Sequence, residues 1–114
     1  MKKILFCTFA LLAFPVHANS ISVTSASTTP TVQVINSSTP ALTVEVTVGS
    51  GDTCLVEFSA TPGSGSGTGN WQAVPGLNAI TANATAILSA PVQALRITRT
   101  AGTATCQMDI AGAF

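Results

Sequence analysis

Apolar and polar residues alternate along four stretches of the chain, and this period of two predicts β-strands with one buried and one solvated face. In residues 42–48, a leucine and three valines alternate with two threonines and a glutamate. The same alternation recurs in residues 54–59, 95–98 and 104–110. Cys54 and Cys106 both fall on the predicted inward faces. The pattern is typical of antiparallel sheets that cover a core on one side.

Four further stretches are expected to form weaker strands, because threonine, valine and isoleucine are frequent in them. They are residues 21–25, 31–35, 71–74 and 84–88. The last of these lies in an alanine-rich region, where Thr81, Thr85 and Ile87 favour strand over a short helix.

Glycine marks the expected turns. Residues 49–52 and the pair Ala101–Gly102 each separate two strong strands, so both are predicted to close hairpins. Residues 61–70 contain alternating glycine and serine, which predicts a long flexible loop at the surface.

About eight short strands separated by turns predict one antiparallel β-sandwich, either immunoglobulin-like or jelly-roll-like, with one disulfide. Trp71 lies between two cysteines, as a tryptophan does in immunoglobulin domains. However, the chain contains no tyrosine and so cannot build the tyrosine corner of that family. The alternation does not determine the order of the strands.

The first eighteen residues have the layout of a bacterial secretory signal. Two lysines precede a short apolar run, residues 4–16, and the run ends near a small residue, Ala18. Because about 20 apolar residues are needed to span a bilayer, a cleaved signal is preferred over an uncleaved anchor. We expect a signal peptide over residues 1–18 and a β-sandwich domain over residues 19–114, exported to the periplasm, the cell surface or the medium.

Cleavage after Ala18 would remove both lysines and the single histidine. The mature chain then has two arginines against four carboxylates, a net charge of about −2. Such a chain has no basic patch for nucleic acid or for an anionic membrane surface. It also has no second apolar run of membrane-spanning length. Its low charge gives weak self-repulsion, which is compatible with packing against copies of itself.

Two cysteines remain in the mature chain, and in an oxidising compartment they are expected to form one disulfide. The Cys54–Cys106 bond would close a loop of about 53 residues, which stabilises the fold by about 4 kcal/mol. A redox-active pair would need a Cys-x-x-Cys spacing or a nearby activating cation, and the sequence shows neither.

Catalysis and metal binding have few candidate side chains. No histidine remains as a general base and no lysine as an amine nucleophile, so we expect neither enzymatic activity nor a cofactor. Glu45 and Glu57 would form an outward carboxylate pair if their strands made one hairpin, although two solvated acids are the preferred interpretation. Asp52 is interpreted as a turn residue rather than a calcium ligand. Without histidine and with paired thiols, zinc is not expected.

Three residues are candidates for ligand or interface contacts. Trp71 is the single tryptophan, and it would serve as a stacking platform or interface anchor if exposed, and as core if buried or half-buried, which is preferred. Arg96 is expected on an outward face, paired with Asp109 or near Gln107 on the next strand. The alternative is that Arg96 recognises a ligand or partner. Phe114 would either dock into a neighbour or cap its own core.

Residues 71–110 resemble small β-modules of bacteriophage virion proteins. The stretch begins with WQAVPG at Trp71, continues with APVQALRIT from Ala90, and ends in a glycine-turned pair of strands that reaches Ile110. The resemblance implies a structural or host-facing role, without catalytic residues to carry over. The predicted export signal departs from it, because most tailed-phage proteins assemble in the cytoplasm.

These features predict a secreted structural or assembly subunit, or an accessory surface module, of a coat, virion or appendage. Strand addition at free edges would join it to copies of itself or to another protein, with residues 21–25 and 110–114 as candidate edges. The alternative is a monomeric binding module for a carbohydrate or a protein, including an inhibitor, that uses Trp71 and residues 61–70.

Overall fold

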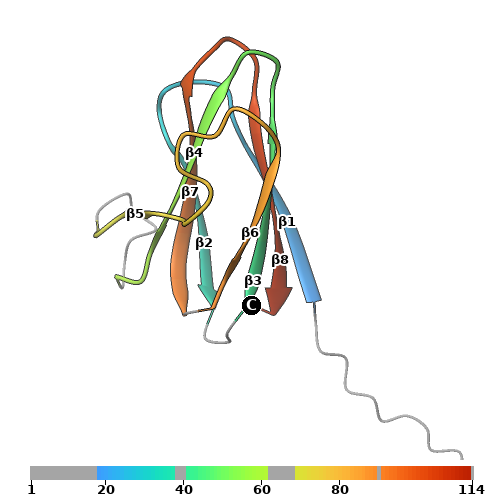
Figure 1. The fold of residues 1–114 in the computed structure, drawn as a ribbon. Coiled ribbons are helices and arrows are strands. Elements are labelled where there is room, and N and C mark those ends of the chain that lie inside the picture. Colours follow the sequence, from blue (N-terminus) through green and yellow to red (C-terminus); the bar gives the residue numbers. More distant parts are fainter. Residues whose placement is uncertain (1–17, 38–40, 62–68, 90, 114) are drawn as a thin grey trace, which may run out of the picture.

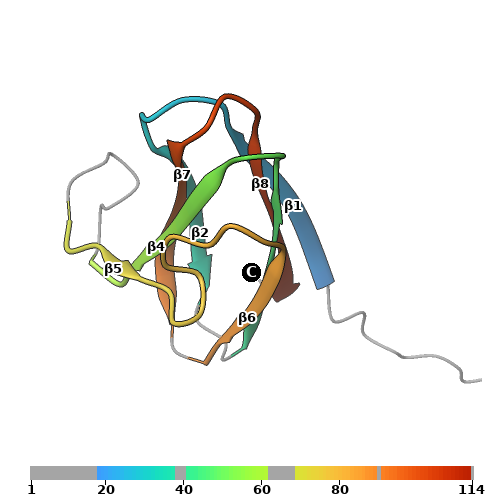
Figure 2. The ribbon, with the colours of Figure 1, turned by 45° about the horizontal axis from the view of Figure 1, so that its top comes forward.

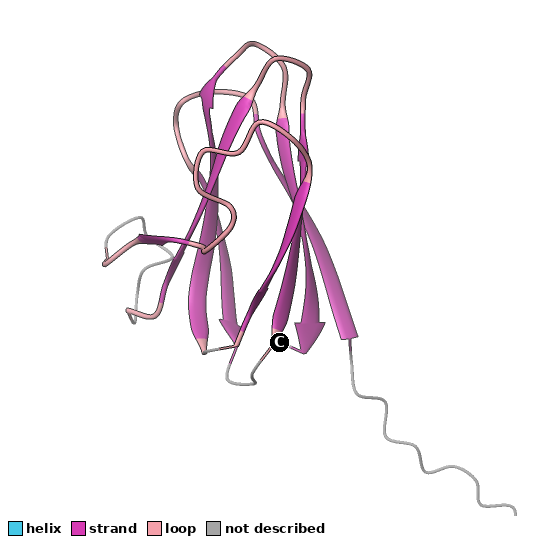
Figure 3. Cartoon of the chain, in the orientation of Figure 1, coloured by secondary structure: helices cyan, strands magenta, loops and turns pink. Residues whose placement is uncertain are grey.

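The computed structural model describes residues 18–37, 41–61, 69–89 and 91–113, and every regular element in these ranges is a β-strand (Figures 1 and 3). The strands are β1 (Ala18–Ser25), β2 (Thr31–Ser37), β3 (Leu42–Val48), β4 (Thr53–Ser59), β5 (Gln72–Ala73), β6 (Ala84–Leu88), β7 (Val92–Ala101) and β8 (Cys106–Ala113). Each stretch predicted from alternation or composition overlaps one of them. The alanine-rich region forms β6, so the preference for strand over helix is confirmed.

The strands form two four-stranded antiparallel sheets (Figure 2). Sheet A has the order β1-β8-β3-β6, and sheet B has the order β2-β7-β4-β5. The pairings are nested, because the first strand pairs with the last, the second with the seventh, the third with the sixth and the fourth with the fifth. The chain is thus folded back on itself like one long hairpin that is rolled into two layers.

This order distinguishes between the two predicted sandwiches. Immunoglobulin sandwiches place consecutive strands such as A and B, or F and G, side by side in a sheet. Among the described strands, only β4 and β5 are consecutive and paired. Eight strands in nested pairs form a jelly roll, so the fold is the jelly-roll alternative.

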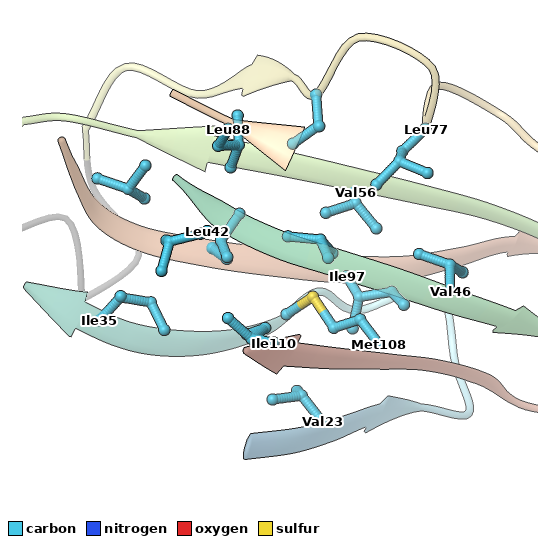
Figure 4. Packing of buried hydrophobic residues seen from close by; sticks show 14 of the residues in the cluster. Val23, Ile35, Leu42, Val46, Val56, Leu77, Leu88, Ile97, Met108 and Ile110 are labelled. Atoms are coloured by element: carbon cyan, nitrogen blue, oxygen red, sulfur yellow. The ribbon is translucent and has the colours of Figure 1, made fainter. Parts of the chain in front are cut away.

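The two sheets bury their alternate residues against each other. Leu42 and Val46 of sheet A and Val56 and Ile97 of sheet B are completely buried, and Figure 4 shows them converging between the layers. Burying an aliphatic side chain of this size contributes about 1.5–3 kcal/mol relative to exposure. This shared apolar layer is the core that the alternation predicted.

Both predicted hairpins at the strong turns are wrong. Residues 49–52 lead from β3 in sheet A to β4 in sheet B, and residues 102–105 lead from β7 in sheet B to β8 in sheet A. Each turn is therefore an arch between the layers. Glycine chemistry fixes the local backbone but not the partner of the next strand, so it does not distinguish an arch from a hairpin. Instead, β4 and β5 form a hairpin across the loop predicted at residues 61–70, of which residues 62–68 lie outside the described ranges.

Asp52 fastens the two arches to each other. Its side chain is buried, and its Oδ1 accepts a hydrogen bond from the Ala104 backbone N–H at 3.0 Å. The Gly49 N–H donates to the Thr105 carbonyl, also at 3.0 Å. Asp52 is thus a turn residue, as expected, and it also ties the layers together at this end.

The disulfide lies at the same end of the sandwich. Cys54 is the second residue of β4, Cys106 is the first residue of β8, and both are completely buried. Their sulfurs are bonded, with the Cα atoms 5.9 Å apart. The predicted bond is confirmed, and it crosses from sheet B to sheet A.

The close contact between the arches makes Gly102 hard to replace. Its φ is +99°, and an added Cβ would lie 2.7 Å from the Cα of Asp52 and 2.8 Å from the carbonyl oxygen of Gly51. Gly102→Ala should lower the free energy of unfolding by about 2–4 kcal/mol, because left-handed strain and overpacking add. Gly51→Ala is the matched control, since Gly51 has a φ of +79° but no atom near the added Cβ, and it should cost only about 1 kcal/mol. Urea unfolding of both variants measures the difference, and equal losses would contradict the tight packing of the arches.

Candidate functional site

The charged side chains of the described strands are spread over both sheets. Glu45 lies on β3 and Glu57 on β4, which belong to different sheets, so the carboxylate pair considered from the sequence is not formed. Glu45 instead stands opposite Asp109 of β8. The Asp109 carboxylate accepts hydrogen bonds from the Ser22 hydroxyl and from the Gln107 amide. Among the described residues, no three His, Cys, Asp or Glu side chains gather where they would hold a metal ion.

Trp71, Arg96 and Glu57 form a cluster on the outer face of sheet B. Trp71 directly precedes β5, and the Arg96 guanidinium lies over its ring, 4.4 Å from the ring centroid. The register of β4 with β7 places Arg96 opposite Glu57, and the Arg96 Nε donates to Glu57 Oε1 at 2.7 Å. The cluster thus combines a cation–π contact with an ion pair between the neighbouring strands β4 and β7.

The expected partner of Arg96 is wrong. Its predicted neighbours, Asp109 and Gln107, lie on β8 in the other sheet, whereas β7 is flanked by β2 and β4. The reason is the same as for the two hairpins, because the strand that follows β7 along the sequence lies in the other sheet and is not its neighbour in space. Arg96 does lie on an outward face, where its side chain is 21% exposed.

The cluster limits what Trp71 can bind. The indole is half-buried, and the guanidinium of Arg96 already occupies a position over its ring. A flat ligand would have to displace this cation or use the remainder of the ring. The arrangement therefore favours a structural contact that holds the start of β5 against β4 and β7.

A groove opens between the edge strands β5 and β6, on the side of the sandwich where residues 74–83 connect β5 in sheet B to β6 in sheet A. Residues 74–80 cover part of this side, because they run along β4 and bond to it. Val74 N–H donates to the Val56 carbonyl at 2.9 Å, and Cys54 and Ile80 exchange two backbone hydrogen bonds of 2.9 and 2.8 Å. Val74 and Leu77 are completely buried, so this segment seals the core beside the first half of β4.

Beyond the segment 74–80, the side of the sandwich remains open as a groove of about 270 Å³, which we call the edge groove. Its apolar lining comes from Phe58, Ala73, Pro75, Ile87 and Leu88, and none of the described residues that line it is charged. Ile87 is 70% exposed, the more exposed of the two large exposed hydrophobic residues in the described ranges. Sequence reasoning missed this groove, because its residues come from separate strands that only the topology brings together.

The edges of the two sheets are β1 and β6 in sheet A, and β2 and β5 in sheet B. Residues 21–25 therefore lie on a free edge, as the sequence interpretation required. Residues 110–113 do not, because β8 is paired on one side with β1 and on the other with β3. Phe114 lies outside the described residues.

A second concavity of about 280 Å³ lies at the base of the β4–β5 hairpin. It is lined by Phe58, Ala60, Thr61, Asn70 and Gln72. The Thr61 hydroxyl oxygen accepts a hydrogen bond from the Asn70 N–H at 3.2 Å, which closes the base of the hairpin.

Comparison with models of protein families, with curated proteins and with solved structures finds no match to the chain. The resemblance of residues 71–110 to virion modules stays a prediction. In the described part of the chain, no helix is long and apolar enough to cross a membrane. The functional argument therefore depends on the surfaces of the sandwich itself.

The ion pair of the Trp71 cluster can be measured by a double-mutant cycle of Glu57→Gln and Arg96→Met. We expect a coupling energy of about 0.5–1 kcal/mol, because both side chains are mostly but not fully shielded from water. Emission from Trp71, the single tryptophan, should shift in the Arg96 variant as the guanidinium leaves the ring. Pairing Arg96→Met with Glu45→Gln is the control, and it should give no coupling because Glu45 lies in the other sheet. Equal coupling in both cycles would contradict a specific pair.

Proposed function

We propose that this chain is an exported, non-enzymatic structural subunit that assembles with copies of itself, in a coat, virion or appendage. The buried disulfide indicates an oxidising environment, which supports the exported part of the proposal. The predicted signal over residues 1–18 supports it independently, and cleavage after Ala18 would leave nearly all of β1 in the mature chain.

The observation that carries the proposal is the unprotected state of the edges of sheet A. Proteins usually blunt free edges with charged side chains, proline, bulges or very short strands. Strand β6 has the sequence ATAIL, and β1 has the sequence ANSISVTS, so neither contains a charge or a proline. Both also pair with their inner neighbours in an unbroken register.

Sheet B makes an instructive contrast within the same molecule. Its edge strand β5 has only two residues, and its other edge strand β2 carries a register shift between Val34 and Ser37. Both are protective devices of the kind that natural sheets use. The free edges of sheet A are therefore the surfaces best suited to strand addition.

A second candidate function is a monomeric binding module for a small neutral ligand such as a sugar. The observation that favours it is the concavity at the base of the β4–β5 hairpin, which is lined by Thr61, Asn70 and Gln72 together with Phe58. Uncharged hydrogen-bonding groups beside an aromatic ring suit a neutral polar ligand. This candidate requires a stable monomer, whereas the assembly proposal requires association.

Size-exclusion chromatography with light scattering on the exported protein tests the proposal. We expect a concentration-dependent oligomer, because the five residues of β6 give only a short joint. Ile87→Lys should shift the equilibrium to monomer, since it places a cation on the free edge. Thr47→Lys is the matched control, because Thr47 is exposed on the central strand β3, and it should leave the oligomer unchanged. A wild-type monomer at all concentrations would reject assembly and favour the binding module.

A further inference from the structure

We propose that the copies join head to tail, with β1 of one copy added to β6 of the next, so that sheet A continues from subunit to subunit. This inference rests on the proposed function and specifies which surfaces meet. It commits to a second copy of this chain as the occupant of the edge groove.

Strand direction permits this joint. Sheet A is antiparallel throughout and has four strands, so its two edges, β1 and β6, run in opposite directions. A second copy in the same orientation, moved sideways, therefore presents its β1 antiparallel to β6 of the first. Each copy would extend the same sheet with the same sense of pairing.

The segment that covers one part of this side of the sandwich indicates what kind of segment would cover the edge groove. Residues 74–80 seal the part beside the first half of β4, because they turn at residues 75–76, hydrogen-bond to β4 and bury Val74 and Leu77. The other part, beside Phe58 and Leu88, has no such cover. A segment with inward apolar residues would therefore complete it, and the free edge of β6 beside the groove suits a strand.

Strand β1 of a neighbour supplies these residues. Ile21 and Val23 point inward, opposite Ile110 and Met108 of β8. Ile21 is only partly buried at its own edge of the core. At this interface, Ile21 of the added copy would lie beside Leu88 of the first copy, on the inner face of the continued sheet. There it would cover the edge groove. Ser20, Ser22 and Thr24 would face outward, beside Thr85 and Ile87 of β6.

Joints between like edges leave the groove unfilled. A two-fold pairing of β1 with β1 would bury Ile21 against Ile21 and leave the groove of each copy open. A two-fold pairing of β6 with β6 would set one groove against another, with no side chain to enter either. Only the joint of β1 with β6 matches the partly exposed isoleucine to the groove. Such a heterologous contact does not close on itself unless the rotation allows a ring, so it leads to filaments.

Edge-blocked variants test this arrangement. One variant carries Ser20→Lys and Thr24→Lys on the exposed outer positions of β1, and the other carries Thr85→Lys and Ile87→Lys on β6. Each variant alone should be monomeric, because every joint would need one blocked edge. An equimolar mixture should form a one-to-one dimer through the two unblocked edges. Light scattering and native mass spectrometry measure these species.

The controls separate the failure of this inference from the failure of the proposed function. Thr43→Lys with Thr47→Lys on β3 should assemble like wild type, and unfolding midpoints with intact disulfide masses establish that each variant is folded. A β6-blocked variant that still dimerises alone would show pairing of β1 with β1, and a β1-blocked variant that dimerises alone would show pairing of β6 with β6. Either result, or a mixture that stays monomeric while wild type assembles, overturns the head-to-tail joint but not assembly itself. A monomeric wild type overturns both.

Discussion

The bond between Cys54 and Cys106 joins the two sheets at one end of the sandwich, and much of the molecule's asymmetry follows from it. Beside this bond, the Asp52 carboxylate connects the two arches, and Gly102 allows them to approach closely. The layers therefore cannot separate there. On the side where β5 and β6 face each other, residues 74–83 connect the sheets but cover only the first half of β4, and the edge groove lies beyond this segment. The same fold is thus closed at one place and incomplete at another.

The core could be predicted from the sequence, because alternation is a local property. The inward faces around Leu42, Val56 and Met108 follow directly from the period of two, and the disulfide follows from two cysteines on such faces. The neighbours of each strand could not be predicted, because pairing depends on residues that are far apart in the chain. Proximity along the sequence therefore predicts Asp109 of β8 as the partner of Arg96, whereas the observed partner, Glu57, lies 39 residues earlier on β4. The edge groove escaped prediction for the same reason, since Phe58 and Leu88 meet only through the topology.

The small number of charges has different effects on the two sheets. Sheet B pairs Arg96 with Glu57 and sets the Arg96 guanidinium over the Trp71 ring, so its outer face carries a fixed polar contact. Sheet A places Glu45 and Asp109 in its centre and leaves both edges uncharged. Charges at the centre of a sheet do not obstruct pairing at its edges. The positions of the charged residues, more than their number, make sheet A suitable for the addition of a further strand.

The nested order of the strands also constrains how the molecule forms. Strand β1 cannot complete its pairing until β8 is present, because Ala18 stands opposite Ala113 at the far end of the chain. Contacts between such distant residues require large loops to close first, which slows folding. Until β8 is in place, sheet A lacks the strand that lies between β1 and β3, so neither of these strands has its full set of neighbours. The surface formed by sheet A is therefore among the last parts of the sandwich to be completed.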